Sequence, residues 1–162
     1  MKAELPILRE EEPRDPYVVR GWDARAPRPG LPPRSLRAAR AIAEALFARE
    51  GGPPPADRLD WLVADLGDFF GHVTLRARLL FRACAATVFW LAPLLIGRLG
   101  PLSRLSIDDR VHALERMEKT PLSLALLGAK AMLSIVYFEH EDAAAEIGWD
   151  QRCLVPHEEH AE

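Results

Sequence analysis

Apolar residues recur at helical spacing in several separate stretches of this chain. The pattern predicts helices over residues 35–50, 56–70, 74–99, a segment opening at Ser106, 120–140 and a short last one over 142–147. Gly51-Gly52, with three prolines after them, stop the first helix, and Gly100-Pro101 close the third. Because no alternating strand pattern, internal repeat or heptad run occurs, the sequence predicts an all-α helical bundle of about five helices.

The third and fifth predicted helices are the most apolar. Lys130 is the only charge in the fifth before Glu139, and a helix that is apolar all round belongs at the centre of a fold. We therefore expect these two helices to form the core, wrapped by three amphipathic helices. Pro93 should kink or split the third helix, and Ser35 and Ser106 are the expected N-caps of the first and fourth.

Prolines divide the chain into parts. Residues 1–33 hold seven of its fourteen prolines, and proline fixes φ and removes a hydrogen-bond donor, so this segment is predicted to be an extended arm. Tyr17 and Trp22 are large apolar anchors on it, able to pack on the chain's own domain or on a partner. The predicted organisation is an arm over 1–33, a helical domain over 34–154 and a polar tail over 155–162.

Charge is unevenly distributed although the net charge is only −3. Residues 34–104 hold ten basic and six acidic side chains, whereas 105–162 hold five and twelve, which suits ion pairs between helices or docking to a charged partner. No nucleic-acid motif occurs, so no nucleic-acid partner is expected. Three interpretations remain for the basic side chains: a solvated face, pairing with Asp, or contact with phosphate. These side chains are Arg34, Arg37, Arg40, Arg76, Arg78 and Arg82.

The N-terminus lacks an apolar secretory stretch, and Cys84 and Cys153 are too few for a disulfide framework, so a cytoplasmic location is expected. The longest uncharged apolar stretch is 83–97. It is shorter than the roughly 20 residues of a spanning helix and contains Pro93. We interpret it as part of a buried core helix. The alternative is contact with a membrane surface, made by the chain directly or as part of a complex. A true membrane span is the least favoured interpretation.

Motifs for catalysis and metal binding are not found in the sequence. No Gly-x-Ser-x-Gly, phosphate-loop or dinucleotide motif occurs. Carboxylates mix with imidazoles at 139–142 and 157–160, and His112 lies three residues before Glu115, but none has the spacing of a di-iron or zinc-protease motif. We predict no catalytic, cofactor-binding or metal-binding residue on this chain.

The second half of the chain resembles a known family. A Leu-Ser start at 105–106 is followed by Arg110, an apolar helix ends in Tyr137-Phe138, and 147–149 read Ile-Gly-Trp. This order is similar to the helical region of GMC-type flavin oxidoreductases, found as an N-terminal extension in long-chain alcohol oxidase-like enzymes. More distantly, it resembles the small subunit of the gluconate 2-dehydrogenase type. The resemblance covers about a third of the chain. The twin-arginine signal common in those small subunits does not occur here, and the arm has no counterpart.

The resemblance implies a non-catalytic accessory subunit that binds and stabilises a separate, large flavoprotein in a hetero-oligomer. The FAD, the catalytic histidine and the substrate pocket would lie on that partner. Aromatic and large apolar side chains dominate interface energetics, so the expected partner-binding residues, with packing on the chain's own core as the alternative, are Tyr17, Trp22, Ile147 and Trp149.

Two further interpretations belong to other classes. The chain could be a helical adaptor or a peripheral membrane-surface protein that uses the third helix and its arginines, or a small enzyme in its own right. Within the fold, Arg110 is expected to pair with Asp142 or Glu146.

Overall fold

The computed structural model describes residues 30–49 and 52–149, which form helices and no strand. The α-helices are α1 (Pro33–Leu46), α2 (Ala56–His72), α3 (Leu75–Leu91), α4 (Ile107–Glu118), α5 (Ser123–Glu139) and α6 (Glu141–Glu146). Two short 3₁₀ helices, η1 (Pro93–Ile96) and η2 (Leu102–Arg104), lie between α3 and α4. The predicted all-α bundle is confirmed. The predicted arm up to residue 29, the end of the predicted domain from residue 150 and the predicted tail over 155–162 lie outside the described residues.

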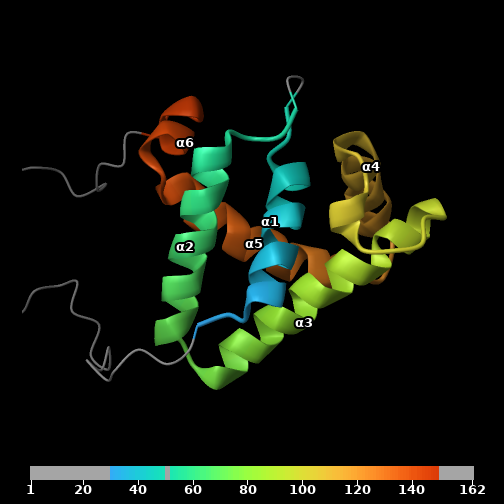
Figure 1. Cartoon of the computed structure of the whole chain (residues 1–162), viewed down its shortest axis with the longest axis horizontal. Coiled ribbons are helices and arrows are strands. Elements are labelled where there is room, and N and C mark those ends of the chain that lie inside the picture. Colours follow the sequence, from blue (N-terminus) through green and yellow to red (C-terminus); the bar gives the residue numbers. More distant parts are fainter. Residues whose placement is uncertain (1–29, 50–51, 150–162) are drawn as a thin grey trace, which may run out of the picture.

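Helix α1 is at the centre of the bundle. In Figure 1 it lies between α2 and α3 while α5 crosses behind it, and it contacts α2, α3, α4 and α5. Its buried side is mostly alanine around the fully buried Ile42, which lets the neighbouring helices approach closely. The predicted N-cap, Ser35, is wrong: the helix begins two residues earlier, at Pro33, because proline in a first turn loses no helical hydrogen bond.

The predicted central position of the third helix is wrong. Its only buried residues are Arg78, Phe81, Ala85 and Val88, and over Leu75–Ile96 just 28% of the most apolar window is buried. Helix α1 takes the central place instead. Apolar composition tells how much surface a helix is able to bury, but it does not tell which helix the others surround.

Helix α5 is buried along one side only. It packs on α1, α2, α3, α4 and α6, and the residues of its buried side are Leu126, Ala129, Leu133, Val136 and Tyr137. Leu133 has no exposed surface. The prediction that this helix lies at the centre of the bundle is therefore confirmed for its buried side.

Local signals for helix ends are mostly obeyed. The predicted cap Ser106 is confirmed, since its Oγ accepts a hydrogen bond from the Asp109 amide at 3.2 Å. Pro93 splits the predicted third helix into α3 and η1, as expected. Thr120 instead forms a turn, with its Oγ1 donating to the Met117 carbonyl at 2.9 Å and accepting from the Leu122 amide. Helix α5 therefore begins at Ser123, later than predicted.

Ion pairs join the basic first half to the acidic second half, as the charge distribution predicts. Glu146 on α6 accepts from Arg58 at 2.6 Å and from Arg49 at 2.7 Å, and the hydrogen bond from Arg58 lowers the pKa of Glu146. Within the first half, Arg40 on α1 pairs with Asp60 on α2. Of the three interpretations given for the basic side chains, pairing with Asp between helices is therefore the one that applies to Arg40.

Arg110 has a different partner from the predicted one. It pairs with Glu44 on α1, whereas Glu146 is already held by Arg58 and Arg49. Its Nε donates to the Leu105 carbonyl and its Nη2 to the Ser103 carbonyl, each at 2.9 Å. One guanidinium therefore fixes α4, the loop before it and α1 together, a role that sequence spacing alone does not reveal.

Carboxylates of α2 and α5 give a pH-dependent contribution to stability. Burial, and then Asp68, raises the pKa of Asp65, while burial, and then Asp65, raises the pKa of Glu139. A raised pKa means that the fold favours the neutral acid. The stabilisation is complete below the ordinary carboxyl pKa near ~4 and is lost as pH rises through the raised values.

We therefore expect Asp65→Asn to raise the free energy of unfolding at neutral pH, by less than about 1 kcal/mol, with the gain shrinking in acid. Urea unfolding at several pH values measures this. Asp57→Asn is the control. It should lower the free energy of unfolding, because Asp57 is exposed in the first turn of α2, where a negative charge is favourable. A loss of stability in Asp65→Asn at neutral pH contradicts the assignment.

Candidate partner-binding surface

Large apolar side chains are exposed along α3, η1 and α5. We call this set the apolar face; each member exposes between 37% and 75% of its surface. The members are Leu79, Leu80, Trp90, Leu91, Leu94, Leu124, Leu127 and Ile135. Soluble monomers rarely expose a contiguous apolar surface larger than a few hundred Å², and larger ones mark interaction sites.

The two parts of the apolar face adjoin where α3 and α5 cross. Leu124, Leu127 and Ile135 follow helical spacing and form one stripe on α5. Gly128 lies beside this stripe, and a Cβ placed on it would be 3.1 Å from Cys84 Sγ on α3. Leu80 is one turn before Cys84 and Leu91 is two turns after it. Both therefore lie on the same side of α3 as Cys84. The missing side chain at Gly128 therefore allows a close crossing that brings the stripes together.

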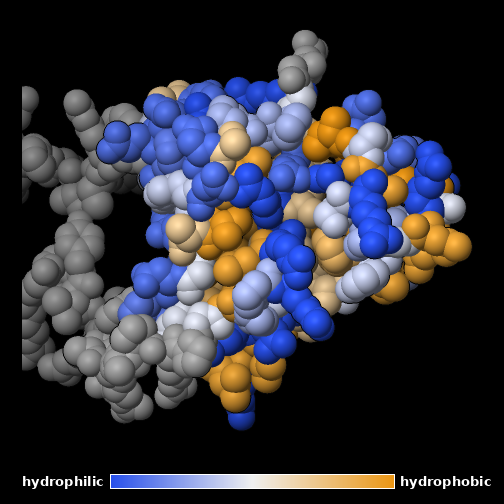
Figure 2. All heavy atoms as spheres, viewed as in Figure 1, coloured by the Kyte–Doolittle hydropathy of each residue, from blue (hydrophilic) through white to orange (hydrophobic). Residues whose placement is uncertain are grey.

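The space-filling view locates part of this apolar surface. In Figure 2, hydrophobic side chains gather at the corner between α2 and α3, at the bottom of the view, and around the segment that follows α3, at the right. Of the arginines predicted to flank the third helix, Arg76 and Arg82 are exposed but Arg78 is buried. Only the first two are therefore available to a partner or a membrane.

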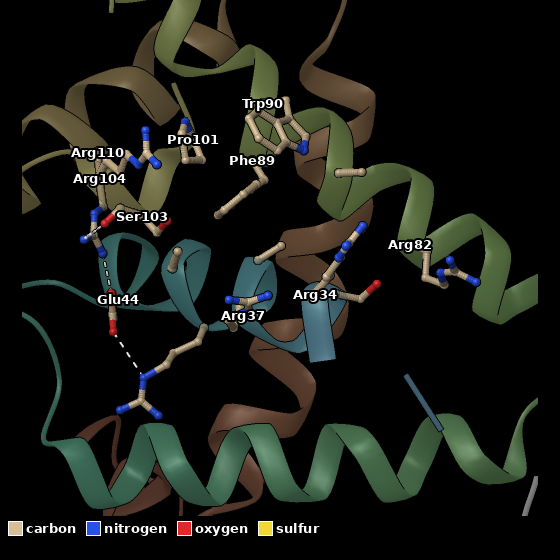
Figure 3. A pocket seen from close by; sticks show the side chains of 15 residues that line it. Arg34, Arg37, Glu44, Arg82, Phe89, Trp90, Pro101, Ser103, Arg104 and Arg110 are labelled. Atoms are coloured by element: carbon tan, nitrogen blue, oxygen red, sulfur yellow. Dashed lines mark hydrogen bonds and ion pairs between the residues drawn. The ribbon is translucent and has the colours of Figure 1, made fainter. Parts of the chain in front are cut away.

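A cleft lies beside the apolar face (Figure 3). Its volume is about 740 Å³, and its walls come from α1, α3 and the segment around η2. Phe89 and Trp90 of α3 line it, so that Trp90 belongs to both the cleft and the apolar face. The arginines that line it are Arg34, Arg37, Arg40, Arg82, Arg104 and Arg110.

Glu44 is the one carboxylate that lines this cleft, and it is engaged by two of the arginines. Arg40 bonds Glu44 at 3.3 Å and also pairs with Asp60, and Arg110 pairs with Glu44 from the other side. The other four arginines of the cleft make no ion pair with any carboxylate of residues 30–49 and 52–149. The cleft is therefore strongly positive.

The predicted partner-binding residues fall into two groups. Ile147 and Trp149 follow α6 and expose 56% and 47% of their surface, so both are accessible. The Trp149 amide donates to the Ala144 carbonyl at 3.0 Å, which fixes the turn after α6. Helix α6 packs on α5 and lies away from α3 in Figure 1, so this pair is separate from the α3 part of the apolar face. Tyr17 and Trp22 lie outside the described residues.

The candidate metal-binding segments have ordinary structural surroundings. No group of three or more His, Cys, Asp or Glu side chains that could hold a metal ion occurs in the part of the chain that the structure describes. His140 packs edge-on against Trp61, with ring centroids 5.2 Å apart. His112 and Glu115 are an exposed pair on α4, 3.9 Å apart. Residues 157–160 lie outside the described ranges.

Sequence reasoning offered the third helix as a contact surface only under the adaptor or membrane-surface interpretation, and it missed the α5 part of the apolar face and the aromatic wall of the cleft. The signal for the α5 part was present: before Glu139 this helix carries no charge except Lys130, α3 carries none after Arg82, and a domain of this size has too few other elements to cover two such helices. The cleft gave no sequence signal, because Arg34, Phe89 and Arg104 are far apart in the chain.

Comparisons with known proteins add no assignment. No protein-family model matches the chain, and no curated protein and no solved structure matches it significantly.

Proposed function

We propose that this chain is a non-catalytic small subunit that binds and stabilises a separate, larger GMC-like FAD-dependent oxidoreductase. The observation that carries the proposal is the apolar face, eight large apolar side chains left uncovered along α3, η1 and α5. Covering apolar surface contributes roughly 25 cal/mol per Å², which makes such a face a strong docking surface for a partner. Ile147 and Trp149 supply a second contact at the end of α6.

The sequence resemblance supports a flavoprotein as that partner. The residues that carry it build the scaffold in this structure: Ser106 caps α4, Arg110 joins α4 to α1, and Tyr137 stacks on Phe47 with ring centroids 3.9 Å apart. The residues that carry the resemblance thus serve the fold. We expect this of a helical region that is shared with the family while the chemistry takes place on another subunit. The FAD and the catalytic groups then belong to the large subunit.

Affinity capture of the tagged full-length chain from its source cells tests this proposal. We expect the wild type to elute with one large chain in constant ratio and with a visible flavin spectrum. Leu80→Glu/Leu127→Glu places two charges in the apolar face and should reduce the recovered flavoprotein by about tenfold or more. Ala56→Glu/Ala64→Glu is the control with the same two added charges, since both alanines are exposed on α2, outside the apolar face.

Either of two results would contradict the proposal. A colourless eluate without a large partner would show that the chain does not bind a flavoprotein. Unchanged recovery of the flavoprotein with Leu80→Glu/Leu127→Glu would show that the apolar face is not its docking surface. Circular dichroism melting of both double variants confirms that the helical domain is intact before capture.

Peripheral membrane binding is a second candidate function, favoured by one observation. Leu75–Ile96 is 22 residues long, and its most apolar 18-residue window has a mean hydropathy of 2.0, enough by length and composition alone to cross a membrane. Trp90 is exposed on it, and aromatic rings favour the membrane–water interface. If the chain sediments with anionic vesicles, loses this in Leu80→Glu/Leu127→Glu and captures no flavoprotein, the membrane is the partner of the apolar face.

A further inference from the structure

The arginines at the start of α1 are poorly placed for stability. Arg34 and Arg37 lie in its first two turns, and no acidic residue occupies the first turn. Positive charges are unfavourable at a helix N-terminus, and like charges three residues apart repel each other. Stability of the fold therefore gives no reason for this arrangement, whereas binding an anion does.

The cleft chemistry identifies the kind of anion. Guanidinium groups present forked donors that match phosphate oxygens in pairs. Arg34, Arg37, Arg82 and Arg104 line the cleft from three elements without a described carboxylate partner, so the site suits a ligand with several negative charges rather than one. A volume of about 740 Å³ is much larger than a phosphate alone and lies within the range of small-molecule sites.

The remaining wall indicates what else the ligand carries. Phe89 and Trp90 lie on the α3 side of the cleft, opposite Arg34 and Arg37 of α1 in Figure 3. A ring or an apolar chain next to these aromatic side chains would leave its phosphates within reach of the arginines. Because Trp90 also belongs to the apolar face, an acyl chain could leave the cleft along α3.

We propose that the cleft between α1, α3 and η2 is a binding site for a phosphorylated ligand with an aromatic or apolar body. Arg34 and Arg37, with Arg82 and Arg104, bind the phosphates, and Trp90 with Phe89 contacts the body. Arg40 and Arg110 stay paired with Glu44 and support the wall. A soluble phosphate ester and a phospholipid head group share this chemistry. The inference does not depend on the flavoprotein partner.

Isothermal titration calorimetry of the full chain without divalent metal tests the site, with pyrophosphate and ATP as soluble probes. We expect saturable binding of both, with ATP tighter because its ring reaches Trp90. Arg34→Glu/Arg37→Glu should weaken both probes by about tenfold or more, and Trp90→Ala should weaken ATP alone. Phosphatidylglycerol vesicles identify the lipid source: binding to them alone, lost in the same arginine variant, assigns a head group to the site.

The matched control is Arg116→Glu/Lys119→Glu, which makes the same change in net charge at exposed positions near the end of α4, outside the cleft. It should leave binding unchanged. Equal weakening by the two double variants would show a general charge effect and overturn the site, as would the absence of saturable binding by pyrophosphate, ATP and vesicles. All variants replace exposed or half-exposed side chains, and thermal melting verifies their folding.

Discussion

Leu133→Asp is expected to unfold the helical domain. Leu133 is fully buried on α5, the helix that packs on α1, α2, α3, α4 and α6. A carboxylate at this position must either stay charged in an apolar core or be protonated at a free-energy cost. The expected loss is about 4–5 kcal/mol, close to the entire stability of many domains. Circular dichroism and urea unfolding measure it.

Leu127→Asp is the matched control for this prediction. It lies on the same helix, with the same change of residue, but its side chain is 60% exposed as part of the apolar face. We expect it to alter the free energy of unfolding by less than about 0.5 kcal/mol. A folded Leu133→Asp protein, with a melting temperature close to that of Leu127→Asp, would contradict the packing of α5.

Arg110→Ala is expected to cost about 2–3 kcal/mol of stability. The Arg110 side chain is only 14% exposed, and its guanidinium pairs with Glu44 and donates to two carbonyls in the segment before α4. Its loss leaves Glu44 with Arg40 alone and frees the η2 segment from α4. Urea unfolding gives the free-energy change.

Two variants separate this role from a general effect of charge. Arg110→Lys should recover only part of the stability, since an ammonium group cannot reach three acceptors in a forked arrangement. Arg116→Ala removes an exposed arginine from the same helix and should change stability by less than about 0.5 kcal/mol. Equal losses of stability in Arg110→Ala and Arg116→Ala would contradict the role of Arg110 in joining α4, the segment before it and α1.

Helix positions could be predicted from the sequence because their signals are local. Ser106, Pro93 and the glycine–proline segment after α1 act on neighbouring backbone and mark ends within a few residues. The arrangement of the helices could not be predicted in the same way. Helix α1, with its arginines and alanines, has the pattern of a peripheral helix. Small side chains nevertheless allow four helices to pack around it.

The candidate site was only partly predictable for the same reason. Exposed Ile147 and Trp149 follow a short helix near a polar segment, so local sequence was enough to expect them at the surface. The full extent of the apolar face required knowing that α1 takes the place predicted for α3. The cleft depends on helix packing that brings Arg34 and Arg104 around Phe89. Arg110 shows the same limit, because its partner Glu44 is 66 residues away.

Hydroxyl-radical footprinting of the free chain and of the captured complex tests the central claim, that the apolar face is covered by a partner. The method reports the exposure of individual side chains. We expect Leu80, Trp90 and Leu127 to be modified in the free chain and protected in the complex, while His112, 60% exposed on α4, remains reactive in both. Equal modification of Leu80, Trp90 and Leu127 in the two states would show that the partner binds elsewhere.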